Sequence, residues 1–171
     1  MELISREEAL KLVRKTSKYS HALVVSFIMG GVAERLGEDR GKWEVVGLLH
    51  DIDYDIVSGD MTKHGVAATE ILKGRLPEDC LYAIKSHDHR TGFKPESRLA
   101  KSLVIADSLA VVIEKTGSDR TLSVEELEAG VERVSVEGPL LKMNLLRCRE
   151  IGLSLSELLK LTVDSLKKDR V

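Results

Sequence analysis

One apolar stripe constrains the fold of this chain more than any other feature of its sequence. Between Ser97 and Glu114 the apolar residues recur at intervals of four and three, which places them along one face of a helix. The stripe consists of Leu99, Leu103, Ala106, Ala110 and Ile113. A face of this kind is stable only when other elements cover it, so the sequence predicts an amphipathic helix inside a folded domain.

Helix start signals recur along the rest of the chain. Three pairs of Ser and Glu, three residues apart, have the form of a capping box: Ser5 with Glu8, Ser123 with Glu126, and Ser154 with Glu157. A short helix is expected near Pro139. Further helices are predicted over about 20–36, ending at Gly37, and over 41–50, 62–72 and 77–87, with loops over 52–61 and 87–96. Because no convincing alternating strand is present, we expect an all-α fold of about eight or nine helices.

Length and composition indicate one domain. A chain of 171 residues can bury a core, and no segment rich in Pro, Gly or Ser divides it. We therefore expect a single domain over 1–171, with C-terminal helices over about 121–168. Lys and Arg total 26 against 28 for Asp and Glu, a net charge of -2, which argues against nucleic acid as the main partner.

Several features predict a cytoplasmic protein that does not enter the membrane. The N-terminus lacks a secretory signal, and the longest uncharged run, residues 22–33, is far shorter than the roughly 20 residues that span a bilayer. Cys80 and Cys148 are far apart and are expected to be free thiols. The chain has no Gln, a single Asn and 32% charged residues, a composition that leans toward a thermophilic source.

Histidine and aspartate residues gather within core-like sequence. All five histidines fall between His21 and His89, the doublet His50-Asp51 closes an apolar run, and Asp107 interrupts another. A carboxylate buried without a partner is strongly unfavourable, so Asp107 faces water, pairs with a base or coordinates a cation. Imidazole and carboxylate ligands without thiolates favour a divalent transition metal, namely Mn, Fe, Co, Ni or Zn.

At these positions the chain resembles the HD-domain metal-dependent phosphohydrolases of the small stand-alone kind. The resemblance extends over residues 21–110. It rests on His21, on the doublet in Leu48-Leu49-His50-Asp51-Ile52, and on Asp107 within Val104-Ile-Ala-Asp-Ser-Leu-Ala. It implies a single helical HD-type domain whose ligand-bearing core spans about 20–115, and in which these four residues hold one metal.

Two further histidines match the family's dinuclear members. His64 and His87 fit the places of the extra ligands, and Asp51 would then bridge two ions. The chain departs from the family at two positions: Asp53 stands where many relatives have glycine, and Asp88 stands where the second histidine of a His-His pair is usual, with His89 one residue later. The resemblance therefore leaves either Asp88 or His89, or neither, as a sixth ligand, and it implies one or two ions.

The resemblance also implies hydrolysis of a phosphate ester by metal-activated water, with a small phosphorylated molecule, above all a nucleotide, as the substrate. Asp51, Asp53 and Lys85 are the predicted catalytic residues, and Asp53, Asp55 or Asp88 could relay a proton to the leaving group. Between Ile84 and Lys101 five cations face two acids, so a phosphate clamp is expected there. Its predicted members are Lys85, Arg90 and Lys101, although any one of them could equally be a solvated surface residue.

Two other functions fit the same ligands. In some relatives this ligand order holds a di-iron centre that performs oxygenase chemistry, for which His64 and His87 would complete the set. Alternatively, the metal-lined pocket could sense a nucleotide without turnover. In that case the C-terminal helices would engage a partner. Their apolar residues are otherwise expected to close the core of the domain, in preference to forming a homodimer face.

Overall fold

The structure is a computed structural model that describes residues 3–117 and 122–168. Within these ranges it contains ten α-helices, two short 3-10 helices and no strand. The predicted all-α fold is therefore confirmed. Nine of the ten α-helices are longer than the single turn of α4, which agrees with the expected eight or nine helices. The helices are α1 (Arg6–Val13), α2 (Tyr19–Leu36), α3 (Arg40–Leu49), α4 (Tyr54–Val57), α5 (Val66–Leu72), α6 (Glu78–Lys85), η1 (His89–Thr91), α7 (Arg98–Thr116), α8 (Val124–Glu137), α9 (Pro139–Leu146), η2 (Arg147–Ile151) and α10 (Leu155–Lys168).

Local signals placed most helix ends correctly. The three capping boxes are formed, with reciprocal hydrogen bonds at the starts of α1, α8 and α10. Helix α2 ends at Gly37, whose φ of 71° is in the left-handed region that glycine adopts without strain. Helix α9 begins at Pro139, as expected. The predicted start of the C-terminal helices at about residue 121 lies outside the described residues.

The segment between α3 and α5 differs from the prediction. The expected loop over 52–61 contains the one-turn helix α4, in which the amides of Ile56 and Val57 donate to the Asp53 carbonyl. The helix expected from residue 62 begins only at Val66. The cause is a tertiary contact. The Asp53 carboxylate accepts hydrogen bonds from the amides of Gly65 and Ala68, which lie 12 and 15 residues later in the chain, and so caps the start of α5.

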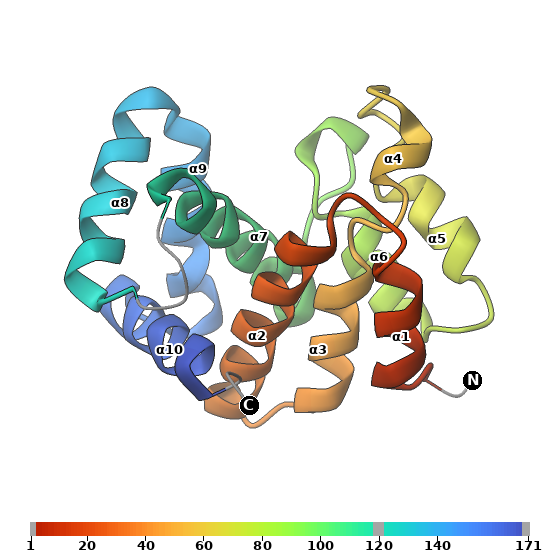
Figure 1. Cartoon of the computed structure of the whole chain (residues 1–171), viewed down its shortest axis with the longest axis horizontal. Coiled ribbons are helices and arrows are strands. Elements are labelled where there is room, and N and C mark those ends of the chain that lie inside the picture. The colour runs from red at the N-terminus through yellow and green to blue at the C-terminus, as the bar shows by residue number, and fades with distance from the viewer. Residues whose placement is uncertain (1–2, 118–121, 169–171) are drawn as a thin grey trace.

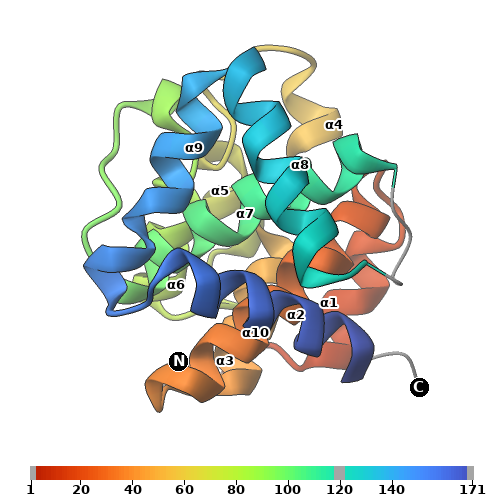
Figure 2. The same ribbon diagram turned by 90° about the vertical axis from the view of Figure 1, so that its left-hand side faces the viewer.

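Helix α7 is the centre of the fold. Figure 1 shows it between α8, α9 and α10 on the left and the N-terminal helices on the right. In the view of Figure 2, α8 to α10 lie in front of α7, and α10 crosses α2, on which it packs. The stripe predicted from sequence is buried, since each of its five residues is at most 6% exposed: Leu99, Leu103, Ala106, Ala110 and Ile113. The helix that brings Asp107 into the site is therefore held on both sides.

The helix lengths, the cysteines and the exposed apolar residues bear on the remaining predictions. In the described residues, no helix is both long and apolar enough to cross a membrane. Both cysteines are free, as predicted, and both are buried. Helix α9 packs on α7 and α8 but leaves Leu140 41% and Met143 62% exposed. The cytoplasmic location, the thermophilic source and the homodimer stay predictions.

Close packing of α2 on α3 depends on a residue without a side chain. A Cβ atom added at Gly47 would lie 2.8 Å from the Ser26 Cα atom and 2.9 Å from its backbone nitrogen. Backbone atoms cannot yield as a flexible side chain can, so the two helices would have to separate. We expect Gly47→Ala to lower the free energy of unfolding by about 1–3 kcal/mol, measured by denaturant titration.

A second alanine variant in the same helix is the matched control. Gly41 is exposed, and the nearest atom to an added Cβ there is an Asp39 carboxylate oxygen at 3.5 Å. Gly41→Ala should leave the stability unchanged or raise it by up to about 1 kcal/mol, because alanine favours the helix. Equal stability of the two variants would contradict the close approach of α2 and α3.

Candidate metal centre

Four segments bring their ionisable side chains together at one carboxylate, that of Asp51. His21 comes from α2, His50 and Asp51 follow the end of α3, His64 precedes α5, and His87 follows α6. These five residues are all buried, with exposed fractions of 7% or less. The residues predicted as ligands from the order of the sequence are thus brought together, although they lie on elements that are far apart along the chain.

The Asp51 carboxylate lies between two groups of potential ligands. On one side, the Nε2 atoms of His21 and His50 lie 3.8 Å from its Oδ2 and 3.2 Å from its Oδ1, respectively. On the other side, the Nε2 atoms of His64 and His87 lie 3.0 and 3.4 Å from Oδ1. Each group offers one ligand atom per residue within 4.8 Å of the others. Asp51 belongs to both groups and is placed to bridge two ions.

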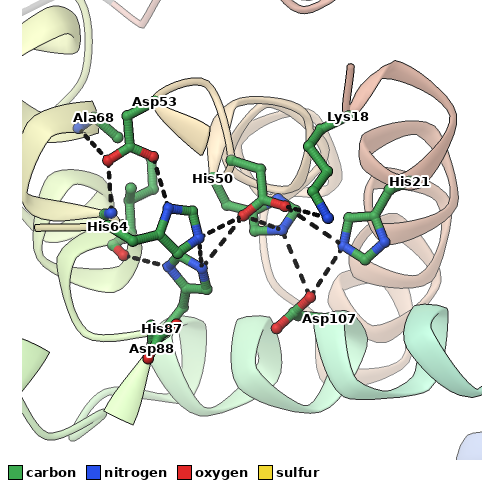
Figure 3. A network of polar contacts seen from close by, with 12 residues as sticks. Lys18, His21, His50, Asp53, His64, Ala68, His87, Asp88 and Asp107 are labelled. Carbon is green, nitrogen blue, oxygen red and sulfur yellow. Dashed lines mark hydrogen bonds and ion pairs between the residues drawn. The ribbon is translucent and has the colours of Figure 1, made fainter. Parts of the chain in front are cut away.

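Asp107 adds a second carboxylate beside the first group. Its Oδ1 lies 3.0 Å from His21 Nε2 and 3.8 Å from His50 Nε2. In Figure 3, His21 and Lys18 lie at one end of the network and His64 and Asp53 at the other, with Asp107 on the His21 side. The first site would therefore contain His21, His50, Asp51 and Asp107, as the family resemblance implied.

Each histidine is oriented through its second ring nitrogen. The Nδ1 atoms of His50 and His87 lie 2.8 and 2.7 Å from the carbonyl oxygens of Gly47 and Ile84. Those of His21 and His64 lie 2.8 and 2.9 Å from the carboxylates of Glu114 and Asp53. A carbonyl or carboxylate at Nδ1 favours a proton there and leaves Nε2 as the free lone pair, the arrangement found behind metal-bound histidines. All four Nε2 atoms accordingly face Asp51.

His50 is the residue whose surroundings best test whether a metal fits. Its ring is completely buried, and among the described residues its Nε2 atom has no hydrogen-bond partner, since the contact with Asp51 lacks hydrogen-bond geometry. A buried nitrogen without a partner is unfavourable unless a ligand satisfies it. A divalent cation between His50 and the carboxylates would do so, and the donor set therefore fits a transition metal.

Glycine allows the second group of ligands to form. Gly65 has a φ of 80°, and a Cβ atom there would lie 2.7 Å from the Ile84 carbonyl oxygen and 3.3 Å from His87 Nδ1. Any other residue would push the two segments apart. With glycine, the Nε2 atoms of His64 and His87 come within 3.2 Å of each other.

The charges of the metal-free site are strongly coupled. Burial lowers the pKa of His21, but its hydrogen bonds to Asp107 and Glu114 outweigh this and raise the pKa to about 10. In the same way, burial lowers the pKa of His64, but the hydrogen bonds that its ring donates to Asp51 and Asp53 outweigh this and raise the pKa to about 9. Burial raises the pKa of Asp51, but the charge of His50 and hydrogen bonds from His64 and His87 hold it well below its ordinary value. Without a metal, protons on the histidines compensate the carboxylates.

Asp53 lies behind His64 and not in the open part of the site. It is completely buried, and its carboxylate accepts from His64 Nδ1 and from the amides of Gly65 and Ala68. Such a carboxylate has no access to a leaving group. The structure therefore does not place Asp53 where the predicted proton relay would need it.

Asp88 and His89 occupy different environments. Asp88 is 8% exposed and ion-paired with Arg90, whose Nη2 lies 2.5 Å from Oδ2, while the Arg90 amide donates to Oδ1 at 2.8 Å. The His89 side chain is 64% exposed. Neither residue belongs to the two groups of ligands within the described residues. Asp88 still lines the cavity of the site, whereas His89 does not.

An open cavity of about 430 Å³ lies over the two groups of ligands. Besides the ligands, its walls include two cations, Lys18 and Arg90. Lys18 Nζ lies 3.9 Å from Asp51 Oδ2 and 4.0 Å from the centre of the Tyr54 ring. Sequence reasoning missed Lys18, although its position one helical turn before His21 could have indicated it.

Two predicted members of the phosphate clamp lie elsewhere. The Lys85 ammonium lies 4.2 Å from the centre of the Phe93 ring, and Lys85 lines a different cavity, between α5 and α6. Lys101 Nζ is ion-paired with Glu150 at 3.0 Å and does not line the cavity of the site. The charge count over 84–101 could not show these directions, because it contains no information on how the loop turns. Of the predicted clamp, only Arg90 faces the ligands.

Comparison with known proteins relates most of this site to one family. The sequence model described as "HD domain" matches residues 19–111, which include all six predicted ligands. Ribonuclease Y of Lawsonia intracellularis is 30% identical over 115 residues, which cover 67% of this chain and 21% of that protein. Ribonuclease Y of Mycoplasma capricolum subsp. capricolum is 33% identical over 91 residues, which cover 53% of this chain and 18% of that protein. The chain thus spans about a fifth of the length of these relatives.

Solved structures of similar fold extend beyond the matched residues. The HD domain of the L. monocytogenes phosphodiesterase PgpH is 15% identical, with a TM-score of 0.60, and the alignment covers 92% of this chain and 94% of that one. The same domain in complex with cyclic-di-AMP gives a TM-score of 0.56 at 15% identity, with 93% of each chain covered. At this identity the likeness concerns the fold, and it includes the C-terminal helices.

Removal of single ligands tests the shared carboxylate. We expect Asp51→Ala to lose all bound metal, because both groups depend on it, and His64→Ala to lose only the ion held with His87. Elemental analysis of protein purified without chelator and reconstituted with Mn²⁺ measures the ions per chain. His89→Ala is the control and should keep the wild-type metal content, since its side chain is exposed. Metal retained in Asp51→Ala would contradict the bridging position.

The raised histidine pKa values predict how metal binding depends on pH. His21, with a pKa of about 10, and His64, with a pKa of about 9, keep their protons at neutral pH, so each ion must displace a proton. The apparent affinity for Mn²⁺ should therefore rise about tenfold per pH unit between pH 6.5 and 8.5, measured by calorimetric titration. Histidines with the ordinary pKa of 6.5 would give an affinity that levels off above pH 7, and that result would contradict the raised values.

Proposed function

Because the chain belongs to the HD-domain family of metal-dependent phosphohydrolases, we propose that it hydrolyses a phosphate ester of a small molecule, most simply a nucleotide. The observation that carries the proposal is the pair of ligand groups that share Asp51 at the floor of an open cavity. The names of the relatives, a ribonuclease and a cyclic-dinucleotide-binding phosphodiesterase domain, agree with a phosphate ester as the substrate.

The residues that would hold the metal are His21, His50, Asp51 and Asp107 for one ion, and Asp51, His64 and His87 for a second. When bound, such an ion supplies a nucleophile by lowering the pKa of a water molecule, and it polarises the phosphoryl group. Overall, hydrolysis joins the water oxygen to phosphorus, breaks one P–O bond and leaves the departing oxygen as a hydroxyl group. This assignment supports Mn, Fe, Co, Ni or Zn and does not choose among them.

The other side chains that line the cavity would bind the substrate and neutralise its charge. Lys18, which is 25% exposed, is placed to attract the phosphoryl oxygens, and its ion pair with Asp51 keeps the ammonium group over the ligands. The Arg90 guanidinium, which also lines the cavity, is held by Asp88 and can neutralise charge on the substrate. We assign Asp53 the task of orienting His64. Burial raises the pKa of Asp88, but hydrogen bonds from Arg90 outweigh this and lower it, so the ionised Asp88 carboxylate would position the Arg90 guanidinium in the cavity.

An oxygenase is the second candidate, because the two additional histidines that a di-iron centre requires are present in the site. His64 and His87 lie together beside Asp51, and the resulting set of four histidines and two carboxylates also suits a pair of iron ions. Anaerobically purified protein that contains two irons and consumes oxygen with an organic substrate would favour this function. Tight nucleotide binding without turnover would instead favour the sensing module.

The hydrolase is tested by turnover on several phosphate esters. Wild-type protein with Mn²⁺ or Co²⁺ should hydrolyse bis(p-nitrophenyl) phosphate and at least one of a set of mono-, tri- and cyclic nucleotides. Lys18→Ala should lower kcat/KM about 10²-fold, because a cation that stabilises the transition state is removed, while Lys11→Ala, at an exposed position of α1, should not. Absence of turnover on every ester would overturn the proposal.

A further inference from the structure

A second cavity adjoins the metal centre. It has a volume of about 250 Å³ and shares one wall, His87, with the cavity over the metal ligands. Both cavities follow α7, because Val104 lines the second one, while Asp107, one helical turn later, lines the first. The volume is smaller than the roughly 300–1,000 Å³ of a site that encloses a whole ligand, so it suits one part of a molecule that also reaches the metals.

The charge of this cavity is positive. Its lining contains Lys94 and Arg147, and none of its described lining residues is acidic. Arg147 is half-buried, yet within the described residues its guanidinium group forms no ion pair and no hydrogen bond. A partly desolvated cation without a partner is unfavourable, and an anionic ligand would compensate it. The Lys94 ammonium also has no carboxylate partner in the described part of the chain.

Phe93 contributes an aromatic surface to the same cavity. It is 39% exposed although it is a large apolar residue. The Lys85 ammonium forms a cation–π contact with its ring, 4.2 Å from the ring centre. Lys85 itself lines a different cavity, between α5 and α6. An exposed ring beside unpaired cations is a surface on which a nucleobase can stack.

The walls of this cavity are held in place. The Tyr82 hydroxyl donates to the Lys94 carbonyl oxygen at 3.0 Å, and the Thr91 hydroxyl donates to the Asp88 carbonyl oxygen at 2.8 Å. Asn144, another lining residue, donates through Nδ2 to Ser108 Oγ at 3.0 Å, which ties α9 to the helix that carries Asp107. The cavity is thus formed before any ligand arrives, as is usual for binding sites.

Asn144 and Arg147 come from outside the residues that the HD-domain family shares, since the family match ends at residue 111. We propose that this cavity is a subsite for a second phosphate group and its adjoining base, so that the preferred substrate is a phosphorylated dinucleotide and not a mononucleotide. The proposal rests on the proposed function, because the scissile phosphate diester would lie at the metals while the second phosphate binds Arg147 and Lys94.

Two dinucleotides that differ in one phosphate test the subsite. The probes are the RNA dinucleotide of two adenosines with a 5′-phosphate and the same dinucleotide without it, each with Mn²⁺-loaded protein. We expect kcat/KM for the phosphorylated form to be at least about tenfold higher, mainly through KM, since an ion pair to the second phosphate adds binding. Equal kcat/KM for the two probes would overturn the subsite.

Variants of two arginines in the same short helix sharpen the test. In Arg147→Ala the ratio between the two dinucleotides should fall to about one, whereas Arg149→Ala, at an exposed position that does not line the cavity, should keep the wild-type ratio. Hydrolysis of bis(p-nitrophenyl) phosphate, which carries no second phosphate, should be the same in Arg149→Ala and in the wild type. A ratio that survives in Arg147→Ala would contradict the assignment of the second phosphate to this residue.

Failure of the subsite can be told apart from failure of the hydrolase. Turnover of bis(p-nitrophenyl) phosphate with no preference between the dinucleotides would reject the subsite and keep the hydrolase. If no ester is hydrolysed, the hydrolase fails, and calorimetric binding of the two dinucleotides to wild type and Arg147→Ala decides on the subsite. Tighter binding of the phosphorylated form by the wild type alone would support it, and equal binding would reject it.

Discussion

The contact between one buried carboxylate and four imidazole rings organises this protein. Asp51 is 4% exposed and lies within 3.8 Å of the Nε2 atoms of His21, His50, His64 and His87. A buried carboxylate without cationic or metal partners would be strongly unfavourable. The segments that deliver the histidines must therefore meet at this point. The remaining contacts of the site serve mainly to hold the four rings in this orientation.

That orientation is produced by the backbone as much as by side chains. His50 and His87 are oriented by carbonyl oxygens three residues earlier in the chain, at the ends of α3 and α6. His64 depends on Asp53, which also caps α5 through two amides. One aspartate thus couples the start of a helix to the direction of a ligand, so the local fold and the metal centre stabilise each other.

The C-terminal helices have a second task besides covering the core. They bury the outer side of α7, and they also place Asn144 and Arg147 beside the metal centre. In the proposed arrangement, residues within the family match would hold the metals, and a segment outside the family match would contact the substrate. The selectivity of such a domain can therefore change without any change in the ligands.

The sequence by itself predicted most of the helices and the candidate metal ligands. Capping boxes, the Gly37 helix end and the stripe of α7 depend on neighbouring residues alone, and the ligand types and their order are visible as a resemblance. Only the tertiary structure decided which cations face the metals, because the direction of a side chain on a loop depends on contacts with distant segments. For this reason the sequence did not indicate that Lys18 lies beside Asp51. Nor did it indicate that Lys101 is ion-paired with Glu150, or that Asp53 lies behind His64.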